Sequence, residues 1–198
     1  YLGWEAFTFI LVMSGLGLFY NVRLVPSNLA ASPRLRRLKE IPGSKAVFTS
    51  MAWGVLAALI PVVCSEQGVS RGTAVAFFYV AGLVFVRTGL FEILAIEGDR
   101  VVGKETLAIA LGRRRTLNLL TGGALVLAVV MCLAAWGGLI PSLGYVLSLT
   151  GLYALGYLTL YRRGSMESGL MLESLVEGNM ILAGLLAFLL DPLNGPFG

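Results

Sequence analysis

Long apolar runs separated by short polar stretches are the dominant pattern of this chain. The runs cover residues 4–20, 46–64, 72–96, 117–139, 142–161 and 169–190. Each is close to the roughly 20 residues that a helix needs to cross the ~30 Å apolar core of a bilayer. The runs lack the period-two alternation that is typical of a transmembrane β-barrel. The pattern therefore predicts an all-α, polytopic membrane bundle of about six transmembrane helices, in a single domain over residues 1–198.

Basic residues occupy alternate loops and predict the orientation of the bundle. They are Arg23, Arg34, Arg36, Arg37, Lys39 and Lys45 in the first loop, Arg100, Lys104, Arg113, Arg114 and Arg115 in the third, and Arg162 and Arg163 in the fifth. The loops between these hold Arg71 alone. Lys and Arg are enriched in cytoplasmic loops, so we expect a multi-pass protein of the cell inner (plasma) membrane whose basic loops are cytoplasmic. The net charge of +4 follows from this bias, and the lipid bilayer, not nucleic acid, is the expected partner.

Two of these loops are long enough to carry a site. Segments 21–45 and 97–116 fall on the same predicted side, so they can meet. Ionisable residues also lie within the apolar runs: Arg87 in the third run, and Glu173 and Glu177 in the last. Such residues are costly in a membrane and face the bundle interior or water. Arg87 therefore either pairs with an acid of another helix or serves a function, and the two glutamates are either solvated at the interface or functional.

The stretch 97–112, "EGDRVVGKETLAIALG", concentrates charge in a chain that is only 13% charged. If the third helix continues through it, Glu92, Ala95 and Asp99 share one face, with Gly98 loosening the turn before Asp99. Carboxylates near water suit Mg²⁺, which often takes one or two of them together with substrate phosphates. Arg100 and nearby Lys104 would hold the remaining phosphate charge. The chain has no histidine, which excludes histidine ligands and bases. The residues alone leave open that these charges are simply solvated.

The order of the residues adds a family resemblance. "FEILAIEGDRVVGKETLAIALG" resembles the second aspartate-rich motif of the UbiA superfamily of intramembrane prenyltransferases, of general form D-x-x-D-x-E-G-D-(R/K)-x-x-G-x-x-T-L-P-V-x-L-G. The matching positions are Glu97, Gly98, Asp99, Arg100, Gly103, Thr106, Leu107, Leu111 and Gly112. "YNVRL", "FTSMAWG" and "LVEGNMILAGLLAFLL" are similar to other family segments. Members usually have nine helices, and the six here resemble the last six. Because the chain opens almost inside a helix, we expect it to be incomplete at its amino terminus.

The resemblance implies an activity and a set of site residues. Family members transfer a prenyl group from a prenyl diphosphate to an aromatic or other small acceptor, as in quinone or related prenyl-lipid biosynthesis, with Mg²⁺ at the diphosphate. Carried over by position, Asp99 and Glu92 are the expected catalytic, metal-binding carboxylates, and Glu97 is a further expected metal ligand. The expected substrate-binding residues are Arg100, Lys104, Tyr20, Lys39 and Lys45.

Two departures from the family pattern keep other interpretations open. Ala95 stands where the motif has its second aspartate, and it cannot bind a metal. The family's first motif, N/D-x-x-x-D, is absent from the sequence, whose only aspartates are Asp99 and Asp191. One alternative is a catalytically altered UbiA-like protein that binds a prenyl lipid or a partner. Another is an unrelated transporter, which would need polar residues or broken helices near the bilayer midplane.

Overall fold

The computed structural model describes residues 41–64 and 68–194, with the backbone alone at Cys64 and at 191–194. It also describes isolated helical positions nearer the amino terminus, namely Trp4, Phe7, Leu11, Ser14, Gly15 and Gly17. Within these described residues every regular element is a helix. The predicted helix 4–20 otherwise lies outside the described residues, as do Tyr20 and Lys39.

Five described helices are long and apolar enough to cross a membrane, and they confirm the predicted polytopic helical bundle. These spans are Ser44–Val63, α4 (Arg71–Leu94), α7 (Arg113–Trp136), α8 (Leu143–Arg162) and Leu170–Leu190 of α9 (Leu170–Asn194). The first span is composite: α2 (Ser44–Gly54) passes through a π-helical turn, η2 (Val55–Leu59), into α3 (Ile60–Cys64). Pro61 explains that turn, because proline cannot donate to the preceding turn and its ring crowds the carbonyl there.

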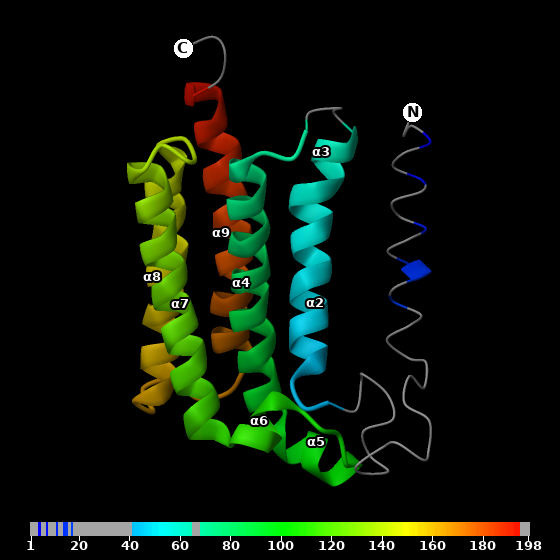
Figure 1. The fold of residues 1–198 in the computed structure, drawn as a ribbon. Helices are drawn as coiled ribbons and strands as arrows, with labels where there is room; N and C mark the ends of the chain where they lie inside the picture. Colours follow the sequence, from blue (N-terminus) through cyan, green and yellow to red (C-terminus); the bar gives the residue numbers. More distant parts are fainter. Residues whose placement is uncertain are drawn as a thin grey trace.

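Helices that follow one another along the chain pack against each other, and α9 lies behind, between α4 and the pair α7 and α8 (Figure 1). α2 packs on α4, α4 on α7, α7 on α8 and α8 on α9, and α4 also reaches α9. Glycines allow these close approaches, as is usual between membrane helices. A Cβ at Gly82 of α4 would lie 2.5 Å from Leu127 of α7, and one at Gly151 of α8 would lie 2.9 Å from the Ala124 carbonyl oxygen of α7. The core therefore follows α4, α7 and α8.

Two short helices, α5 (Ile96–Val102) and α6 (Leu107–Leu111), connect α4 to α7 at one end of the bundle (Figure 1). The continuous helix expected through Asp99 is wrong, because α4 ends at Leu94 and Ala95 adopts φ −89°, ψ 3°. The chain turns at this residue, not at Gly98, which lies within α5. After the turn, α5 has no fully buried residue, and α6 packs back against α4.

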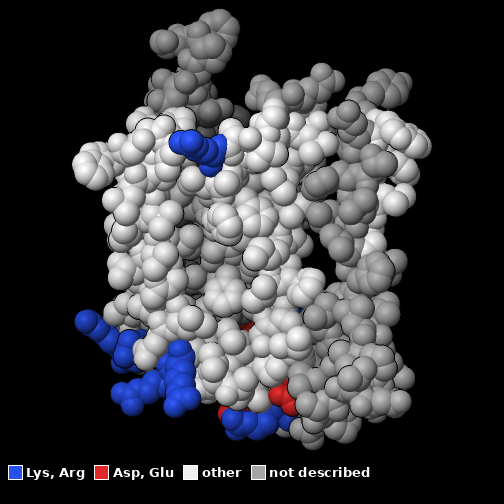
Figure 2. All heavy atoms as spheres, in the orientation of Figure 1, with Lys and Arg blue, Asp and Glu red and all other residues white. Residues whose placement is uncertain are grey.

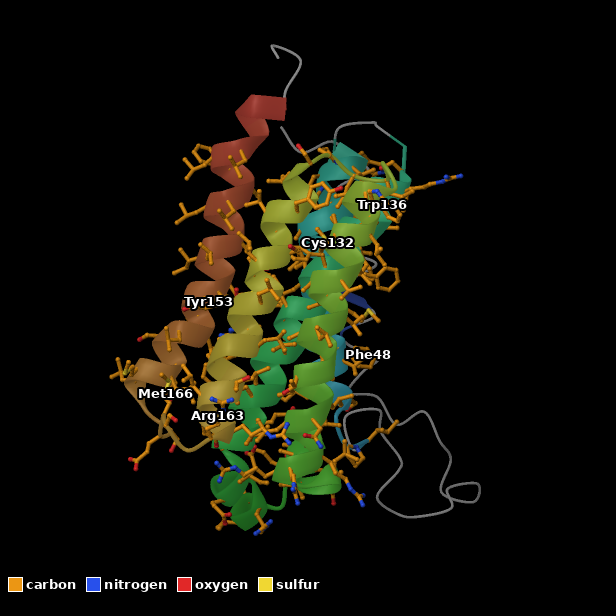
Figure 3. All side chains as sticks on the ribbon, turned by 90° about the vertical axis from the view of Figure 1, so that its left-hand side faces the viewer. Phe48, Cys132, Trp136, Tyr153, Arg163 and Met166 are labelled. Carbon is orange, nitrogen blue, oxygen red and sulfur yellow. The ribbon has the colours of Figure 1, made fainter. Side chains whose placement is uncertain are left out.

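Basic side chains gather at the end of the bundle that carries α5 and α6, which we call the basic end (Figure 2). Arg113 begins α7 there, and Arg162 ends α8 there. Arg71 begins α4 at the opposite end. In the view turned by 90°, Arg163 and Met166 lie at the basic end and Trp136 lies toward the other (Figure 3). This asymmetry follows the alternation of basic loops in the sequence. Which side of a membrane the basic end faces stays a prediction.

Candidate functional site

Glu92 is buried near the end of α4, with 4% of its surface exposed. Its Oε2 accepts a hydrogen bond from the backbone N–H of Leu107, at 2.9 Å. Leu107 is the first residue of α6, and the first N–H groups of a helix have no partner within it. The side chain of Thr106 accepts another of these free groups, the N–H of Ile109, at 3.3 Å. The hydrogen bond from Leu107 to Glu92 therefore stabilises the packing of α6 against α4.

The second carboxylate oxygen of Glu92 has no such partner. Oε1 is buried and makes no hydrogen bond to any described residue. Two charged side chains act on the Glu92 carboxylate electrostatically, Lys45 from the start of α2 and Asp99 from α5. A buried polar atom without a partner carries a free-energy penalty, and here a cation or a donor group would remove it.

Gly43 explains how the start of α2 comes close to α6. Its φ of +80° lies in the left-handed region, and a Cβ at this position would lie 2.9 Å from Leu107 Cδ1. A larger residue would be strained at this φ and would force the Leu107 side chain to move. The expectation that the two polar segments meet is confirmed for the described part of the first one, because Lys45 follows directly after this contact.

Asp99 and Lys104 form the next layer of the site, at the surface. Lys104 Nζ donates to Asp99 Oδ1 at 3.0 Å, with side-chain exposures of 59% and 14%. The turn between them is closed by the Lys104 backbone N–H, which donates to the Asp99 carbonyl at 3.0 Å. Gly103 allows this turn with φ +70°. A mostly shielded carboxylate therefore lies beside a cation that is largely exposed to solvent.

Glu97 and Arg100 of α5 form a separate ion pair. Arg100 Nη1 lies 3.7 Å from Glu97 Oε2, and both side chains are exposed, so the pair adds little stability. In the part of the chain that the structure describes, no three or more His, Cys, Asp or Glu side chains gather into a possible metal site. Glu92 and Asp99 alone fit Mg²⁺ in its two-carboxylate mode, where substrate phosphates and water complete the shell. The unpartnered Oε1 of Glu92 supports that fit.

A second polar group lies deeper in the bundle. Arg87 of α4 donates from Nε to Glu177 Oε2 of α9 at 3.0 Å, and from Nη2 to Glu177 Oε1. The guanidinium also lies 5.0 Å above the centre of the Phe91 ring. The interpretation that Arg87 pairs with an acid of another helix is confirmed. Sequence reasoning identified both charges but not their pairing, which depends on where α9 lies against α4.

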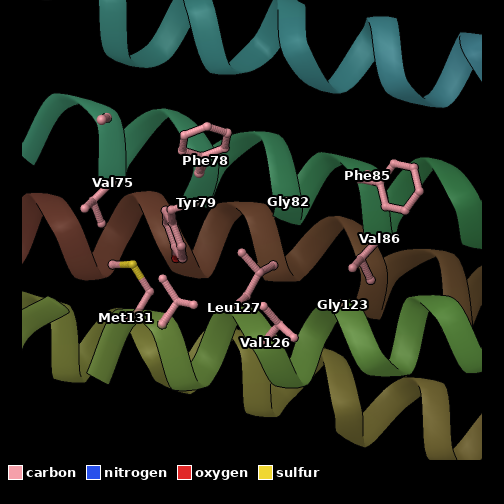
Figure 4. A pocket seen from close by; sticks show the side chains of 12 residues that line it. Val75, Phe78, Tyr79, Gly82, Phe85, Val86, Gly123, Val126, Leu127 and Met131 are labelled. Atoms are coloured by element: carbon pink, nitrogen blue, oxygen red, sulfur yellow. The ribbon is translucent and has the colours of Figure 1, made fainter. Parts of the chain in front are cut away.

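Two cavities accompany these groups. The larger, about 480 Å³, is an apolar groove between α4 and α7 that passes Gly82 and Gly123 (Figure 4). Its lining suits a hydrocarbon chain, because Tyr79, the residue there with a polar side chain, directs its hydroxyl to Thr150 Oγ1 at 2.8 Å. The smaller, about 230 Å³, holds the Arg87–Glu177 pair.

Comparison with known proteins gives one match. Residues 1–174 match the model of the UbiA prenyltransferase family. No curated protein and no solved structure matches the chain.

Proposed function

This chain belongs to the UbiA prenyltransferase family, and on that premise we propose that it is a Mg²⁺-dependent prenyltransferase of a cell membrane. It moves a prenyl group from a prenyl diphosphate to an aromatic or other small acceptor. The observation that carries the proposal is the unpartnered, buried Glu92 Oε1, which lies within electrostatic reach of Asp99 and Lys45 at the basic end. Two carboxylates of which one oxygen has no partner, beside exposed lysine side chains, suit a metal cation and a diphosphate together.

Three basic side chains, Arg100, Lys104 and Lys45, would contact the diphosphate. Arg100 of α5 and Lys104, in the turn that follows α5, have side-chain exposures of 62% and 59%, so both can turn toward phosphate oxygens. Lys45 approaches from α2. During transfer the bond between the allylic carbon and the diphosphate oxygen breaks, and its electron pair goes to the oxygen. Positive charge placed in advance where this negative charge develops lowers the barrier.

Magnesium would be held by Glu92 and Asp99. When bound, it would supply Lewis-acid charge to the leaving diphosphate. Glu97, expected as a further ligand, is directed toward Arg100 in this structure, and Ala95 offers no ligand atom. The substrate's phosphates and water would complete the coordination that Glu92 and Asp99 begin.

The membrane supplies the setting of the reaction. The basic end, with the site loops, faces the cytoplasm of a cell whose inner membrane holds the bundle, as the enrichment of Lys and Arg indicates. The prenyl tail lies among apolar helices, and the groove between α4 and α7 matches its chemistry. The product class is a quinone precursor or a related prenyl lipid.

A catalytically altered protein that binds a prenyl lipid is the second candidate. It is favoured by Ala95, which is exposed at the turn between α4 and α5 where the family carries an aspartate. This candidate retains prenyl diphosphate binding but shows no transfer.

The experiment is Mg²⁺-dependent turnover by the complete protein in lipid nanodiscs, with a labelled prenyl diphosphate and a panel of phenolic acceptors. Asp99→Asn should lower turnover at least 100-fold, because the charge that faces the metal and diphosphate is lost. Glu167→Gln is the control: it removes an exposed charge between α8 and α9, and turnover should not change. Full activity of Asp99→Asn would refute the assignment. Binding without turnover in the unaltered protein would favour the second candidate.

A further inference from the structure

The cavity around Arg87 and Glu177 lies between three membrane-spanning helices. Trp53 of α2, Val84 and Arg87 of α4, and Glu177 and Met180 of α9 line it, with a volume of about 230 Å³. It is smaller than a typical pocket for a drug-sized ligand, which begins near about 300 Å³, so it suits a molecule of one ring.

The ion pair in this cavity is only partly shielded. The side chains of Arg87 and Glu177 are 35% and 45% exposed among the described residues, although both lie within spans. A charged pair that served only to join α4 and α9 would be favourable if it were enclosed and fully hydrogen-bonded, and costly if it faced lipid. The exposed side of the pair therefore faces water or a polar ligand group.

The Arg87 guanidinium is fixed by its neighbours but still has N–H donors that no described residue accepts. Nε and Nη2 bond to Glu177, and Phe91 covers one face of the group. These contacts leave Nη1 without a hydrogen-bond partner among the described residues. A fixed donor thus stands beside a fixed acceptor, the Glu177 carboxylate.

The charges of the pair determine which polar group fits. A hydroxyl can accept from Arg87 and donate to Glu177 at once. A carboxylate can only accept, and it would lie beside the Glu177 charge while Arg87 is already neutralised. The pair therefore favours a neutral hydroxyl over an anion. Trp53, which is 52% exposed, offers a flat aromatic surface, and Met180 offers a thioether sulfur that makes favourable contacts with aromatic rings.

We propose that this cavity is the acceptor subsite, and that the Arg87–Glu177 pair selects a neutral ring by its hydroxyl group. The inference rests on the proposed function and adds the acceptor class to it. Arg87 lies five residues before Glu92 on α4, which is about 7.5 Å along the helix axis. A ring bound at Arg87 therefore lies deeper in the bundle than the carboxylates assigned to the diphosphate, on the apolar side of them.

Binding of three matched rings tests the proposal without magnesium or prenyl diphosphate. The probes are 4-methylphenol, 4-methylbenzoate and toluene. Trp53 is the fluorescent reporter, in the complete protein in nanodiscs with every other tryptophan replaced by phenylalanine. A site built to bond a hydroxyl rejects an analogue that lacks it, so 4-methylphenol should bind at least tenfold more tightly than toluene or 4-methylbenzoate. Equal affinity for 4-methylphenol and toluene, or tighter binding of 4-methylbenzoate, would overturn the proposal.

Variants of the pair then assign the effect to these side chains. Arg87→Lys keeps the positive charge but loses the planar guanidinium with its several N–H donors. Glu177→Gln keeps the shape of the side chain but loses its negative charge. Each should reduce the preference for 4-methylphenol over toluene to less than about threefold. Arg163→Lys, at the basic end outside the cavity, is the control and should keep it. A preference that persists in both pair variants contradicts the proposal. If a pair variant does not fold, the affinities of the protein with Arg87 and Glu177 intact for 4-methylphenol, 4-methylbenzoate and toluene still test the proposal.

The two proposals fail in different ways. Loss of Mg²⁺-dependent turnover in every condition, with the hydroxyl preference intact, removes the proposed reaction and leaves a ring-binding cavity. Turnover without any hydroxyl preference at Trp53 leaves the prenyltransferase and removes this subsite.

Discussion

Glu92 is the residue at which anchoring and metal binding can be separated by two substitutions. Glu92→Gln keeps an oxygen that accepts from the Leu107 N–H and removes the charge. Glu92→Ala removes both. The structure therefore predicts different patterns of stability and binding for the two variants, because one oxygen of Glu92 is used by α6 and the other is unpartnered.

The magnitude for Glu92→Ala follows from the lost hydrogen bond. A bond to a charged acceptor contributes about 1.5–3 kcal/mol, and the Leu107 N–H would be left without its partner. Taking about 2 kcal/mol, local opening of α6 becomes about 30-fold more frequent. Hydrogen exchange of the backbone amides of residues 107–111 should accelerate by that factor in Glu92→Ala. In Glu92→Gln the exchange should accelerate only about fivefold, since an acceptor remains but its bond to the Leu107 N–H is no longer charge-assisted.

Binding provides the second readout. Glu92→Gln should bind the Mg²⁺ complex of a prenyl diphosphate at least tenfold more weakly, measured by calorimetry, because a neutral amide is a much poorer ligand for a hard cation. Its thermal stability should not fall, since a neutral side chain costs less to bury than a charged one. Unchanged affinity in Glu92→Gln would show that Glu92 only anchors α6. Unchanged amide exchange in Glu92→Ala would refute the anchoring argument itself.

Three further predictions concern other parts of the bundle. Ala95→Asp should tighten Mg²⁺ binding about tenfold in a titration, because it adds a carboxylate at the turn beside α5; no tightening would show that this is not a vacant ligand position. Gly123→Leu should weaken binding of long-chain prenyl diphosphates severalfold relative to dimethylallyl diphosphate, because it fills the groove between α4 and α7. Gly122→Leu, facing open space on the same helix, should not, and equal effects would exclude the groove as the tail site. Gly151→Val should destabilise the bundle by about 1–3 kcal/mol in thermal unfolding, because a Cβ there would lie 2.9 Å from a backbone oxygen of α7, whereas Gly156→Val has open space; equal melting temperatures would contradict the packing argument.

The sequence was sufficient for the transmembrane helices because length and hydropathy alone decide whether a segment spans a bilayer. The predicted run 72–96 and the observed helix Arg71–Leu94 differ by one residue at the start and two at the end. α4 begins where Ser70 and Thr73 form a reciprocal capping box, with the Ser70 side chain accepting the Thr73 N–H at 3.1 Å. Such local signals can be found without a structure.

The turn at Ala95 could not be predicted in the same way. Alanine is the strongest helix former, so local propensity favours a continuous helix there. A tertiary contact overrides this propensity: Glu92 accepts a hydrogen bond from the first residue of α6, which requires the chain to fold back after α4. The Arg87–Glu177 pair escaped prediction for a related reason. Each charge is visible in the sequence, but 90 positions separate them, and only the packing of α9 near α4 brings them together.

The position of Glu92 on α4 also bears on how the chain enters a membrane. The carboxylate lies two residues before the helix ends, and the connection from Ala95 to Gly112 returns to the same end of the bundle. If α4 enters the membrane from the basic end, with Arg71 crossing first, the Glu92 carboxylate does not have to cross the hydrocarbon layer. An acidic residue at the centre of that layer costs about 2.5–3.5 kcal/mol. During biogenesis Glu92 can therefore stay near the membrane surface, and its hydrogen bond to the Leu107 N–H can form after α4 and α7 have both inserted.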